Sequence, residues 1–396
     1  MKIVLADYGG YPFTLQLAKR LSDRGHEVLY ICRDASRLMD ALQPGVETGG
    51  LRVVRLKGDG RMEKGNLLVR WSQERGFGRH AARLLRRERP DILVSANMPL
   101  DAQQVLAREA RRHGAFFVYW LQDLIGTATR AILTRRLGLA GTLLGQYYVR
   151  LENRLLARSD TVIAISEAFL DTLKDRGVEP RRLAVVPNWS PLDELPLAAK
   201  DNPWSREHGW ADRPVVMYSG SLGMKHHPGL LLDLARSLAD SDHAEVVVVA
   251  EGTGARWLEE GAAASSVDNL HVLPFQDRRR LPQVLGTADV LVAMLESSAG
   301  SFSVPSKVLS YLCAGRPIVA SVPEHNDVAK LLQETVSGLV CSPSDADALA
   351  ATVHGLLRDP ITRERMGRNA RQYAEQTFDI DAITARFESI FRGMVA

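Results

Sequence analysis

Two lysines lie in segments that should meet at one edge of a predicted sheet, where they could hold a negatively charged ligand. Lys225 lies in a small, donor-rich loop that also contains Gly220 and Ser221. Lys307 follows a Pro-Ser pair that can open a helix, because proline suits the first helical turn and the Ser306 side chain can cap it. A cation there costs about 0.3–1 kcal/mol, since the helix dipole is already positive at that end. An anion held by both lysines and the helix amides would reverse this cost, so we expect a diphosphate site; the alternative for Lys225 is a solvated surface lysine.

Two further segments of the C-terminal half place ligand-binding groups after strands. Glu251 and Gly252 form a turn that opens a helix, and the carboxylate could accept ribose hydroxyls or could cap the helix. Phe275 and Gln276 follow the next strand and offer an aromatic face and backbone amides that suit a nucleotide base. These positions extend the predicted anion site into a nucleotide site.

The N-terminal half carries a second set of candidates. Gly9 and Gly10 form a tight turn whose amides could approach an anion or a sugar, although such a turn can also serve without a ligand. Asn97 ends the run DILVSAN, and Asp123 follows FFVYWLQ. We expect both at a sheet edge where ligands bind, with Asp123 as the candidate base or acceptor contact; its alternative is a helix cap.

The elements that must position these residues are strands and helices in alternation. Continuous β-branched runs separated by amphipathic helical stretches are typical of a parallel sheet covered on both faces, with ligands outside the carboxyl ends of the strands. The runs are 2–7, 27–32, 52–56, 91–97, 116–122, 161–166, 183–188, 214–220, 245–252, 270–275, 289–295, 317–321 and 337–342. We therefore expect an α/β protein with two doubly wound halves and a cleft between them.

The expected divisions of the chain follow from where this alternation stops and restarts. They are an N-terminal domain over 1–190, a linker over 191–212, a C-terminal domain over 213–375 and a last helix over 376–396.

Length, charge and cysteine usage exclude several classes of protein. A chain of 396 residues is too long for one core, and a net charge of +3 gives no argument for a nucleic-acid partner. Cys32, Cys313 and Cys341 show no CxxC spacing and fit a reducing cytoplasm. His226 and His227 are adjacent without an acidic cluster, so we expect no metal. No apolar run reaches the length of a membrane span, so we expect a cytoplasmic protein.

One segment, residues 127–159, predicts peripheral contact with the inner face of the plasma membrane. It carries six arginines against the single acidic residue Glu152, with leucine, isoleucine and tyrosine between them. A basic, amphipathic helix pair of this kind suits anionic lipid. The alternative is a core-packing helix with a solvated arginine face.

Taken together, the motifs resemble the GT-B fold glycosyltransferases of family 4, in the branch that makes bacterial polysaccharides and glycoconjugates. In chain order the motifs are RGHEV, VIAISEAFL, VVPNW, SGSLGMKHHPG, VVAEGTGA, LPFQ, TADVLVAML, FSVPSKVLSYLCAGRPIVAS, GLVCSPSDADAL and RNARQYAEQTF. The resemblance implies two Rossmann-like domains, with acceptor binding in the N-terminal one and nucleotide-sugar binding in the C-terminal one. It further implies a final helix that crosses back to the first domain, and no metal or other cofactor. It also implies retaining transfer from a nucleotide-diphosphate sugar, with UDP-sugar expected, to a glycan, a lipid-linked saccharide or a small molecule.

Residue roles carry over from the family by position. Lys225 and Lys307 would bind the diphosphate, and the Gly9–Gly10 loop would close over the sugar. The rest of the implied donor site is Gly220, Ser221, Glu251, Gly252, Phe275, Gln276, Glu296, Ser303, Val304 and Ser306.

The sequence departs from the family pattern at one helix. Many members carry two glutamates there, but these positions hold Gly300 and Ser310, with Glu296 as the candidate replacement for the first. Where members often have a histidine, this chain has Gln122 and Asp123. A GT-B epimerase and a non-catalytic nucleotide-sugar-binding subunit of a polysaccharide assembly therefore stay open as alternatives.

Overall fold

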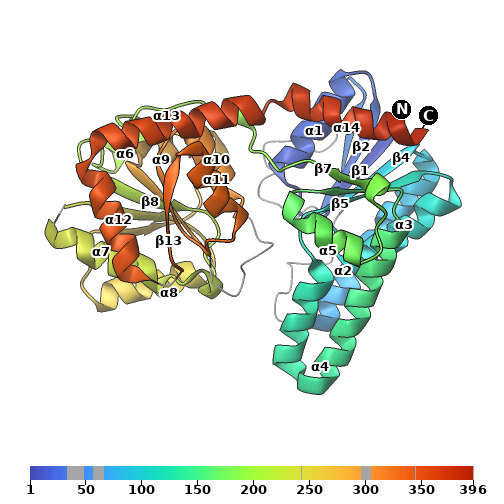
Figure 1. Cartoon of the computed structure of the whole chain (residues 1–396), viewed down its shortest axis with the longest axis horizontal. Coiled ribbons are helices and arrows are strands. Elements are labelled where there is room, and N and C mark those ends of the chain that lie inside the picture. Colours follow the sequence, from blue (N-terminus) through green and yellow to red (C-terminus); the bar gives the residue numbers. More distant parts are fainter. Residues whose placement is uncertain (34–48, 57–66, 242, 296–304, 344, 396) are drawn as a thin grey trace. The chain divides into compact units, whose positions relative to one another are not determined.

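Each apolar run expected as a strand forms one in the computed structural model of the chain (Figure 1). The structure describes residues 1–33, 49–56, 67–241, 243–295, 305–343 and 345–395. The chain divides into unit 1, Met1–Asn188 with Ile380–Ala396, and unit 2, Trp189–Asp379. Each unit contains one parallel sheet with helices packed around it, as expected for two doubly wound domains.

Unit 1 is built on a seven-stranded parallel sheet in the order β3-β2-β1-β4-β5-β6-β7. Its elements are β1 (Lys2–Asp7), α1 (Pro12–Asp23), β2 (Glu27–Arg33), β3 (Leu51–Leu56), α2 (Leu67–Glu88), β4 (Ile92–Ala96), α3 (Leu100–Arg112), β5 (Phe116–Leu121), α4 (Ile125–Arg158), β6 (Thr161–Ala164), α5 (Leu170–Asp175), β7 (Leu183–Val185) and α14 (Ile380–Val395). The strand order reverses between β1 and β4, which is where ligands enter such sheets.

Unit 2 is built on a six-stranded parallel sheet in the order β10-β9-β8-β11-β12-β13. Its elements are α6 (Pro203–Glu207), β8 (Val215–Ser219), α7 (Gly229–Ser241), β9 (Glu245–Val249), α8 (Thr253–Ala264), β10 (Leu270–Leu273), α9 (Leu281–Thr287), β11 (Val290–Met294), α10 (Lys307–Ala314), β12 (Ile318–Ser321), α11 (Asp327–Thr335), β13 (Gly338–Cys341), α12 (Ala346–Arg358) and α13 (Pro360–Thr377). The switch in strand order falls between β8 and β11.

The central strands are buried along their length, because helices cover both faces of each sheet. All residues of β4, β9 and β11 are buried. This explains why the strands are continuous apolar runs rather than alternating ones. Such a core leaves the strand ends and the loops after them as the places for polar chemistry.

Helix α14 belongs to unit 1 although it is last in the chain. Phe387 is fully buried, and its ring lies 4.9 Å from that of Trp120 on β5. Arg20 of α1 and Arg24, which follows that helix, pair with the Asp381 carboxylate, with distances of 2.8 Å from Arg20 Nε and from Arg24 Nη2 to Oδ1. Apolar contact and ion pairs together attach the helix.

Residues 191–212, expected as a linker, contain helix α6 and lie within unit 2. The Asn202 side chain caps α6, accepting from Trp204 N at 2.9 Å and from Ser205 N at 3.1 Å. Its amide also donates to Thr287 Oγ1 of α9 at 3.1 Å. The segment is therefore anchored by a buried capping box rather than extended between units.

Candidate functional site

In unit 2, Lys307 stands at the switch point of the sheet. It begins α10, which follows β11, and it contacts the loop that follows the neighbouring strand β8. Its ammonium lies 3.7 Å from the centre of the Tyr218 ring and donates to the Tyr218 hydroxyl. Burial raises the pKa of Tyr218 well above its usual value, so this partner stays a neutral phenol. The aromatic face of Tyr218 and its neutral hydroxyl, which accepts a hydrogen bond, therefore stabilise the Lys307 ammonium.

The loop after β8 is shaped so that Lys307 can lie against it. Gly220 has φ of 142°, and a Cβ there would lie 2.9 Å from Cε of Lys307. The Tyr218 hydroxyl donates to the Ser221 carbonyl at 2.8 Å, which fixes the turn. Ser221 itself is exposed. Glycine is needed here both for the backbone conformation and for the close approach of the lysine.

A second tyrosine fastens α10 to the end of β8. The Tyr311 hydroxyl accepts from Ser219 N at 2.8 Å and donates to the Ser219 carbonyl at 3.0 Å. Burial raises the pKa of Tyr311 as well. Lys307 lies one turn earlier on the same helix, so this pair of hydrogen bonds sets the distance between the lysine and the β8 loop.

The loops after β8 and β9 are in backbone contact. Leu222 N donates to the Glu251 carbonyl at 3.0 Å, and Gly254 N donates to the Leu222 carbonyl at 3.0 Å. Gly252 has φ of 131°, and a Cβ there would lie 2.4 Å from the Leu222 carbonyl oxygen. The predicted positions at 220–221 and 251–252 therefore belong to one continuous loop surface.

The start of α10 differs from the expectation in one respect. Ser306 occupies the cap position but adopts helical angles, and its side chain makes no capping hydrogen bond. The residue is exposed. The amides of Val308 and Leu309 instead meet the carbonyls of Pro305 and Ser306, at 3.0 and 3.2 Å. The prediction that the Ser306 hydroxyl caps the helix is therefore wrong.

The pair expected to flank a base lies beyond β10. Phe275 is 42% exposed, so its ring is available to a ligand. The Gln276 side chain is engaged by the protein: it accepts from the buried Trp204 indole at 3.3 Å and donates to the Pro274 carbonyl at 2.9 Å. The Phe275 ring is thus exposed, whereas the Gln276 side chain holds the turn.

Several predicted positions lie outside the described part of the structure. They are Glu296, Ser303, Val304 and the side chain of Lys225. The backbone of Lys225 forms a 3-10 turn, Met224–His226, at the end of the β8 loop.

In unit 1, a buried carboxylate organises the predicted glycine turn. Asp7 ends β1 and is fully buried. Its carboxylate accepts from Gly9 N at 3.0 Å, Tyr11 N at 2.8 Å and the Tyr30 hydroxyl at 3.0 Å. Burial raises the pKa of Asp7, and these hydrogen bonds oppose the rise. Gly10, with φ of 65°, completes the turn, and the hydrogen bonds from the Gly9 and Tyr11 amides to the Asp7 carboxylate hold it in place.

Polar residues follow the three adjacent strands β1, β4 and β5. Asn97 has φ of 46°, and its amide nitrogen is buried without a hydrogen bond among the described residues. The same holds for the amide nitrogen of Gln122, whose oxygen accepts from Asn188 at 2.6 Å. Asp123 is exposed, and its charge helps to raise the pKa of Tyr11 in the glycine turn, after burial and Asp7. The structure thus brings Gly9, Asn97 and Asp123 to one sheet edge.

Sequence reasoning missed Asp7 and Tyr218, the two residues that support the glycine turn and Lys307. Both are among the last residues of apolar strands, and a polar side chain there was the available signal. Their partners are distant in sequence (Lys307 is 89 residues from Tyr218), so the spacing alone does not reveal the contact.

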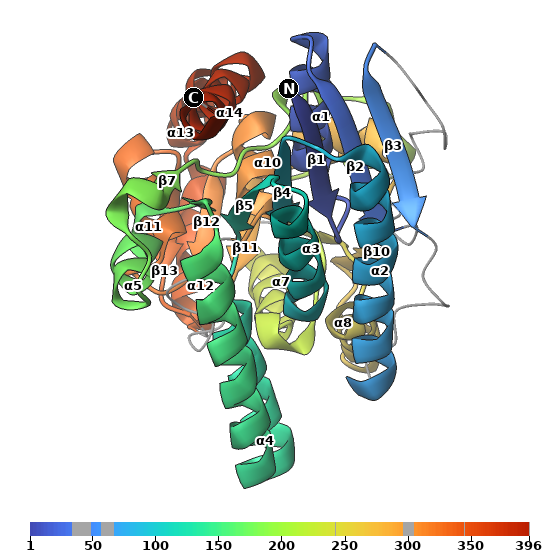
Figure 2. The same ribbon diagram turned by 90° about the vertical axis from the view of Figure 1, so that its right-hand side faces the viewer.

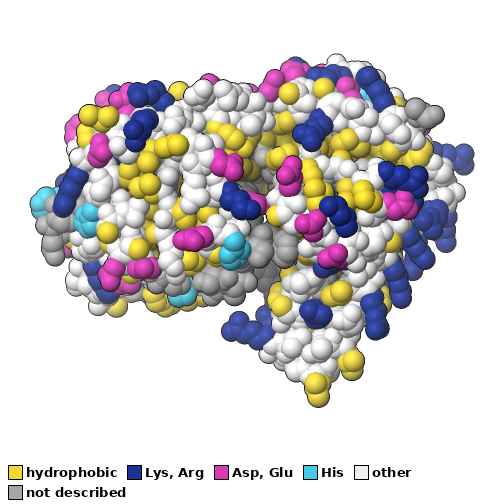
Figure 3. All heavy atoms as spheres, viewed as in Figure 1, with side chains coloured by type: hydrophobic (Ala, Val, Ile, Leu, Met, Phe, Trp, Pro, Cys, Tyr) yellow, Lys and Arg dark blue, Asp and Glu magenta, His cyan; other side chains and the backbone are white. Residues whose placement is uncertain are grey.

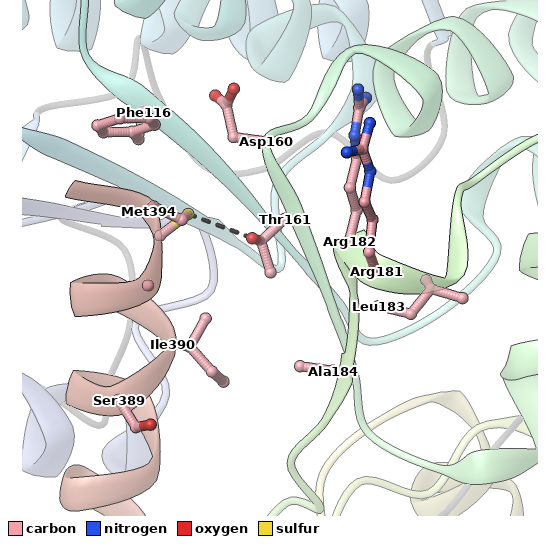
Figure 4. A pocket seen from close by; sticks show the side chains of 11 residues that line it. Phe116, Asp160, Thr161, Arg181, Arg182, Leu183, Ala184, Ser389, Ile390 and Met394 are labelled. Carbon is pink, nitrogen blue, oxygen red and sulfur yellow. Dashed lines mark hydrogen bonds between the residues drawn. The ribbon is translucent and has the colours of Figure 1, made fainter. Parts of the chain in front are cut away.

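A surface pocket of about 420 Å³ in unit 1 lies at the opposite sheet edge (Figure 4). Phe116, Thr161 and Leu183, the first residues of β5, β6 and β7, line it together with α14. Figure 4 shows Thr161 pointing to Met394, with its hydroxyl 3.2 Å from the sulfur. This pocket lies at the amino ends of the strands, whereas ligands of a doubly wound sheet bind at the carboxyl ends.

The described residues contain no group of three or more His, Cys, Asp or Glu arranged to hold a metal ion. None of the helices that these residues form is long and apolar enough to cross a bilayer.

Two family models match the chain, one on each half. The model described as "Glycosyl transferase 4-like domain" matches residues 9–189, and "Glycosyl transferases group 1" matches residues 201–373. The second match contains the β8 loop and α10, and the first contains the glycine turn and Asp123.

Curated relatives are also glycosyltransferases. The chain is 27% identical over 318 residues to the putative colanic acid biosynthesis glycosyl transferase WcaI of Escherichia coli (strain K12), covering 78% of this chain and 75% of that protein. It is 25% identical over 258 residues to the probable glycosyltransferase WbjE of Pseudomonas aeruginosa, covering 62% of this chain and 61% of that protein.

Solved structures share the fold over nearly the whole chain. HepE from Anabaena, in complex with UDP-glucose, matches with a TM-score of 0.75 at 17% identity and covers 99% of this chain and 100% of its own. WaaG, a glycosyltransferase involved in lipopolysaccharide biosynthesis, matches with a TM-score of 0.71 at 16% identity, covering 99% and 100%.

Proposed function

We propose that this chain, which belongs to the family 4 glycosyltransferases of the GT-B fold, moves a sugar from a UDP-sugar to an acceptor hydroxyl with retention of configuration and without a metal. That it is a glycosyltransferase follows from the family. The donor, the stereochemistry and the acceptor are the proposal. HepE, a structural neighbour, was solved with UDP-glucose, which supports a UDP-sugar as the donor.

The placement of Lys307 carries the donor assignment. Its ammonium stands at the helix N-terminus and at the switch point between β8 and β11, against the glycine loop at Gly220. A diphosphate at this place meets a positive helix end, a lysine and a loop without bulky side chains. The exposed hydroxyls of Ser221 and Ser306 are the neighbouring donors to the phosphate oxygens.

In this proposal, Lys307 and the start of α10 stabilise the negative charge that develops on the nucleotide diphosphate as it leaves. When the bond from the anomeric carbon to the phosphate oxygen breaks, negative charge grows on the β-phosphate. A fixed ammonium and helix-end dipole stabilise that charge where it forms, and one such donor contributes about 2.7–4 kcal/mol in comparable oxyanion sites. Lys225, in the same loop region, is the proposed second cation.

The acceptor belongs to the ligand edge of unit 1 in this proposal. Asp123 is exposed, and its charge acts on Tyr11 of the Gly9–Tyr11 turn. It is therefore the proposed base or acceptor contact. The buried amide nitrogens of Asn97 and Gln122, which lack partners among the described residues, are candidates to bind acceptor hydroxyls. The acceptor class is a glycan, a lipid-linked saccharide or a small molecule.

A thermal-shift screen with UDP-, GDP-, ADP- and dTDP-sugars tests the donor assignment. A ligand that binds only the folded protein stabilises it by about 2.7 kcal/mol at a concentration of 100 Kd, so the correct nucleotide raises Tm. We expect UDP-sugars to do so and the others to have little effect. A rise with another base and none with UDP would contradict the donor assignment while leaving the family unchanged.

Product analysis separates transfer from epimerisation. Donor incubated alone should give slow hydrolysis, and added acceptor should give a glycoside of unchanged anomeric configuration. Conversion of the donor into an isomeric nucleotide sugar without acceptor would contradict transfer.

A further inference from the structure

Helix α4 of unit 1 is a helical hairpin that turns at Gly138. This residue has φ of 58° and ψ of −131°, and the helix reverses there. The two arms extend away from the sheet in both views (Figures 1 and 2). About 13 residues separate Ile125 from the turn, so the arm is roughly 20 Å long at 1.5 Å per residue.

Glycines form the contact between the arms. A Cβ at Gly141 would lie 2.0 Å from the Leu133 carbonyl oxygen, and one at Gly145 would lie 2.6 Å from Cα of Arg130. The backbones are therefore too close for large side chains between them. Of the leucines near the turn, Leu133 is buried, whereas Leu137, Leu139, Leu143 and Leu144 are exposed.

The outward residues form an apolar tip on the hairpin. The tip consists of Ile132, Leu137, Leu139, Leu143, Leu144 and Tyr147, which are 45–86% exposed. Leu139 and Leu143 are the most exposed of these, at 86% and 76%. Figure 3 shows hydrophobic side chains at the end of this hairpin and basic ones along its sides. Large apolar side chains gathered in exposed positions at the end of one element indicate an interaction surface.

The charges around the apolar tip have one sign. Residues 124–151 contain four arginines and no acidic residue. Arg130, Arg135, Arg136 and Arg150 are all exposed. The nearby Glu152 is fully buried and pairs with Arg176 at 2.7 Å, so it does not offset them at the surface.

We propose that the α4 tip inserts into the headgroup region of an anionic lipid bilayer. An interfacial helix buries its apolar face about 5–10 Å deep, which is the depth of the last two turns of each arm. Leu139 and Leu143 then meet the acyl boundary, and Arg135 and Arg136, one turn from the bend, lie at the level of the lipid phosphates. Contact with a lipid-linked acceptor would follow, and that last link rests on the proposed function.

Self-association is the competing use of the tip, and the charges disfavour it. In a symmetric dimer the same patch meets itself, so the arginines of two tips would face each other. An anionic surface instead complements all four. Apolar residues at the end and cations behind them match the order of layers in a bilayer leaflet.

Sedimentation of the full chain with vesicles tests the proposal. We expect binding to phosphatidylcholine vesicles that contain phosphatidylglycerol, and much weaker binding to phosphatidylcholine alone or at high salt. The double variant Leu139→Ser with Leu143→Ser should bind about tenfold or more weakly, because each substitution removes an apolar side chain whose transfer from water into the bilayer favours binding. Arg135→Gln with Arg136→Gln should weaken binding to anionic vesicles only.

Ile361→Ser is the matched control. Ile361 is 78% exposed on α13 of unit 2, so its loss changes a similar exposed apolar area away from the hairpin. It should bind vesicles as the unchanged protein does. The UDP-induced rise in Tm should be the same in all these variants, which separates failure at the tip from failure at the donor site.

Three results would overturn the proposal. They are no binding to anionic vesicles, equal binding by the double leucine variant, and a concentration-dependent dimer, seen by sedimentation without lipid, that the leucine substitutions abolish. A Leu139→Trp variant adds a direct reading: its fluorescence should shift to the blue and be quenched by brominated lipid. An unchanged spectrum with vesicles bound would also contradict insertion.

Discussion

Lys307 is placed by residues that sequence spacing does not connect. Its ammonium rests on Tyr218, and its helix is fixed by Tyr311 to the backbone of Ser219. The lysine itself could be predicted, because a cation in the first turn of a helix calls for an anion. The two tyrosines that support the lysine could not be predicted, because each lies in an apolar run and resembles an ordinary aromatic residue of the core. The uncapped Ser306 was unpredictable for a related reason: a serine before a helix usually caps it.

Gly220 is the residue whose substitution tests the shape of the β8 loop. Its φ of 142° is rarely adopted by other residues, and a Cβ would meet the Lys307 side chain. We expect Gly220→Ala to lower the free energy of unfolding of unit 2 by about 1–3 kcal/mol and to weaken UDP binding. Urea denaturation and a UDP titration measure the two effects.

Gly223→Ala is the control within the same loop. Gly223 has φ of −100°, and the nearest atom to a Cβ there, other than its neighbours, is His226 Nδ1 at 4.0 Å. Its substitution should change stability by less than about 0.5 kcal/mol. Equal effects of the two substitutions would show that the loop tolerates a side chain at Gly220.

At the scale of elements, the alternation of strands and helices was predictable and the packing of α4 was not. The runs 2–7 and 317–321 correspond to β1 (Lys2–Asp7) and β12 (Ile318–Ser321), because β-branched residues without polar interruption fit a buried parallel strand. Residues 127–159 read as a basic amphipathic pair. That glycines would close the two arms, and so turn leucines outward, depended on contacts such as Gly141 with Leu133.

The attachment of α14 to unit 1 predicts a dependence of stability on acid pH. The Arg20 and Arg24 guanidinium groups lower the pKa of Asp381 to about 2. A carboxyl with a depressed pKa in the folded state stabilises it above the unfolded value of 3.8, and this contribution is lost as pH falls toward 2. Between pH 5 and 3 the urea midpoint of the unchanged protein should therefore fall further than that of Asp381→Asn.

Asp347→Asn is the control for this comparison. Asp347 is exposed on α12 of unit 2 and should leave the pH dependence of the midpoint close to that of the unchanged protein. A midpoint for Asp381→Asn that follows the unchanged protein across the same range would show that the ion pairs with α1 do not hold α14.

At the scale of the whole molecule, the proposed function assigns the donor to one sheet and the acceptor to the other. Unit 2 presents Lys307 and a glycine loop suited to a diphosphate, and unit 1 presents Asp123 and a carboxylate-anchored glycine turn. The family matches follow the same division, over residues 9–189 and 201–373. The family matches show that the chain is a glycosyltransferase, and substrate experiments with unit 1 variants test the proposed acceptor site.

Calorimetric titration of UDP into the unchanged protein and Lys307→Ala tests the donor site most directly. Lys330→Ala, which removes an exposed lysine on α11, serves as the control. Loss of a charged hydrogen bond to phosphate should raise Kd by roughly 10- to 100-fold in Lys307→Ala and leave it unchanged in Lys330→Ala. Equal UDP affinity in all three proteins would contradict the placement of the diphosphate at the start of α10.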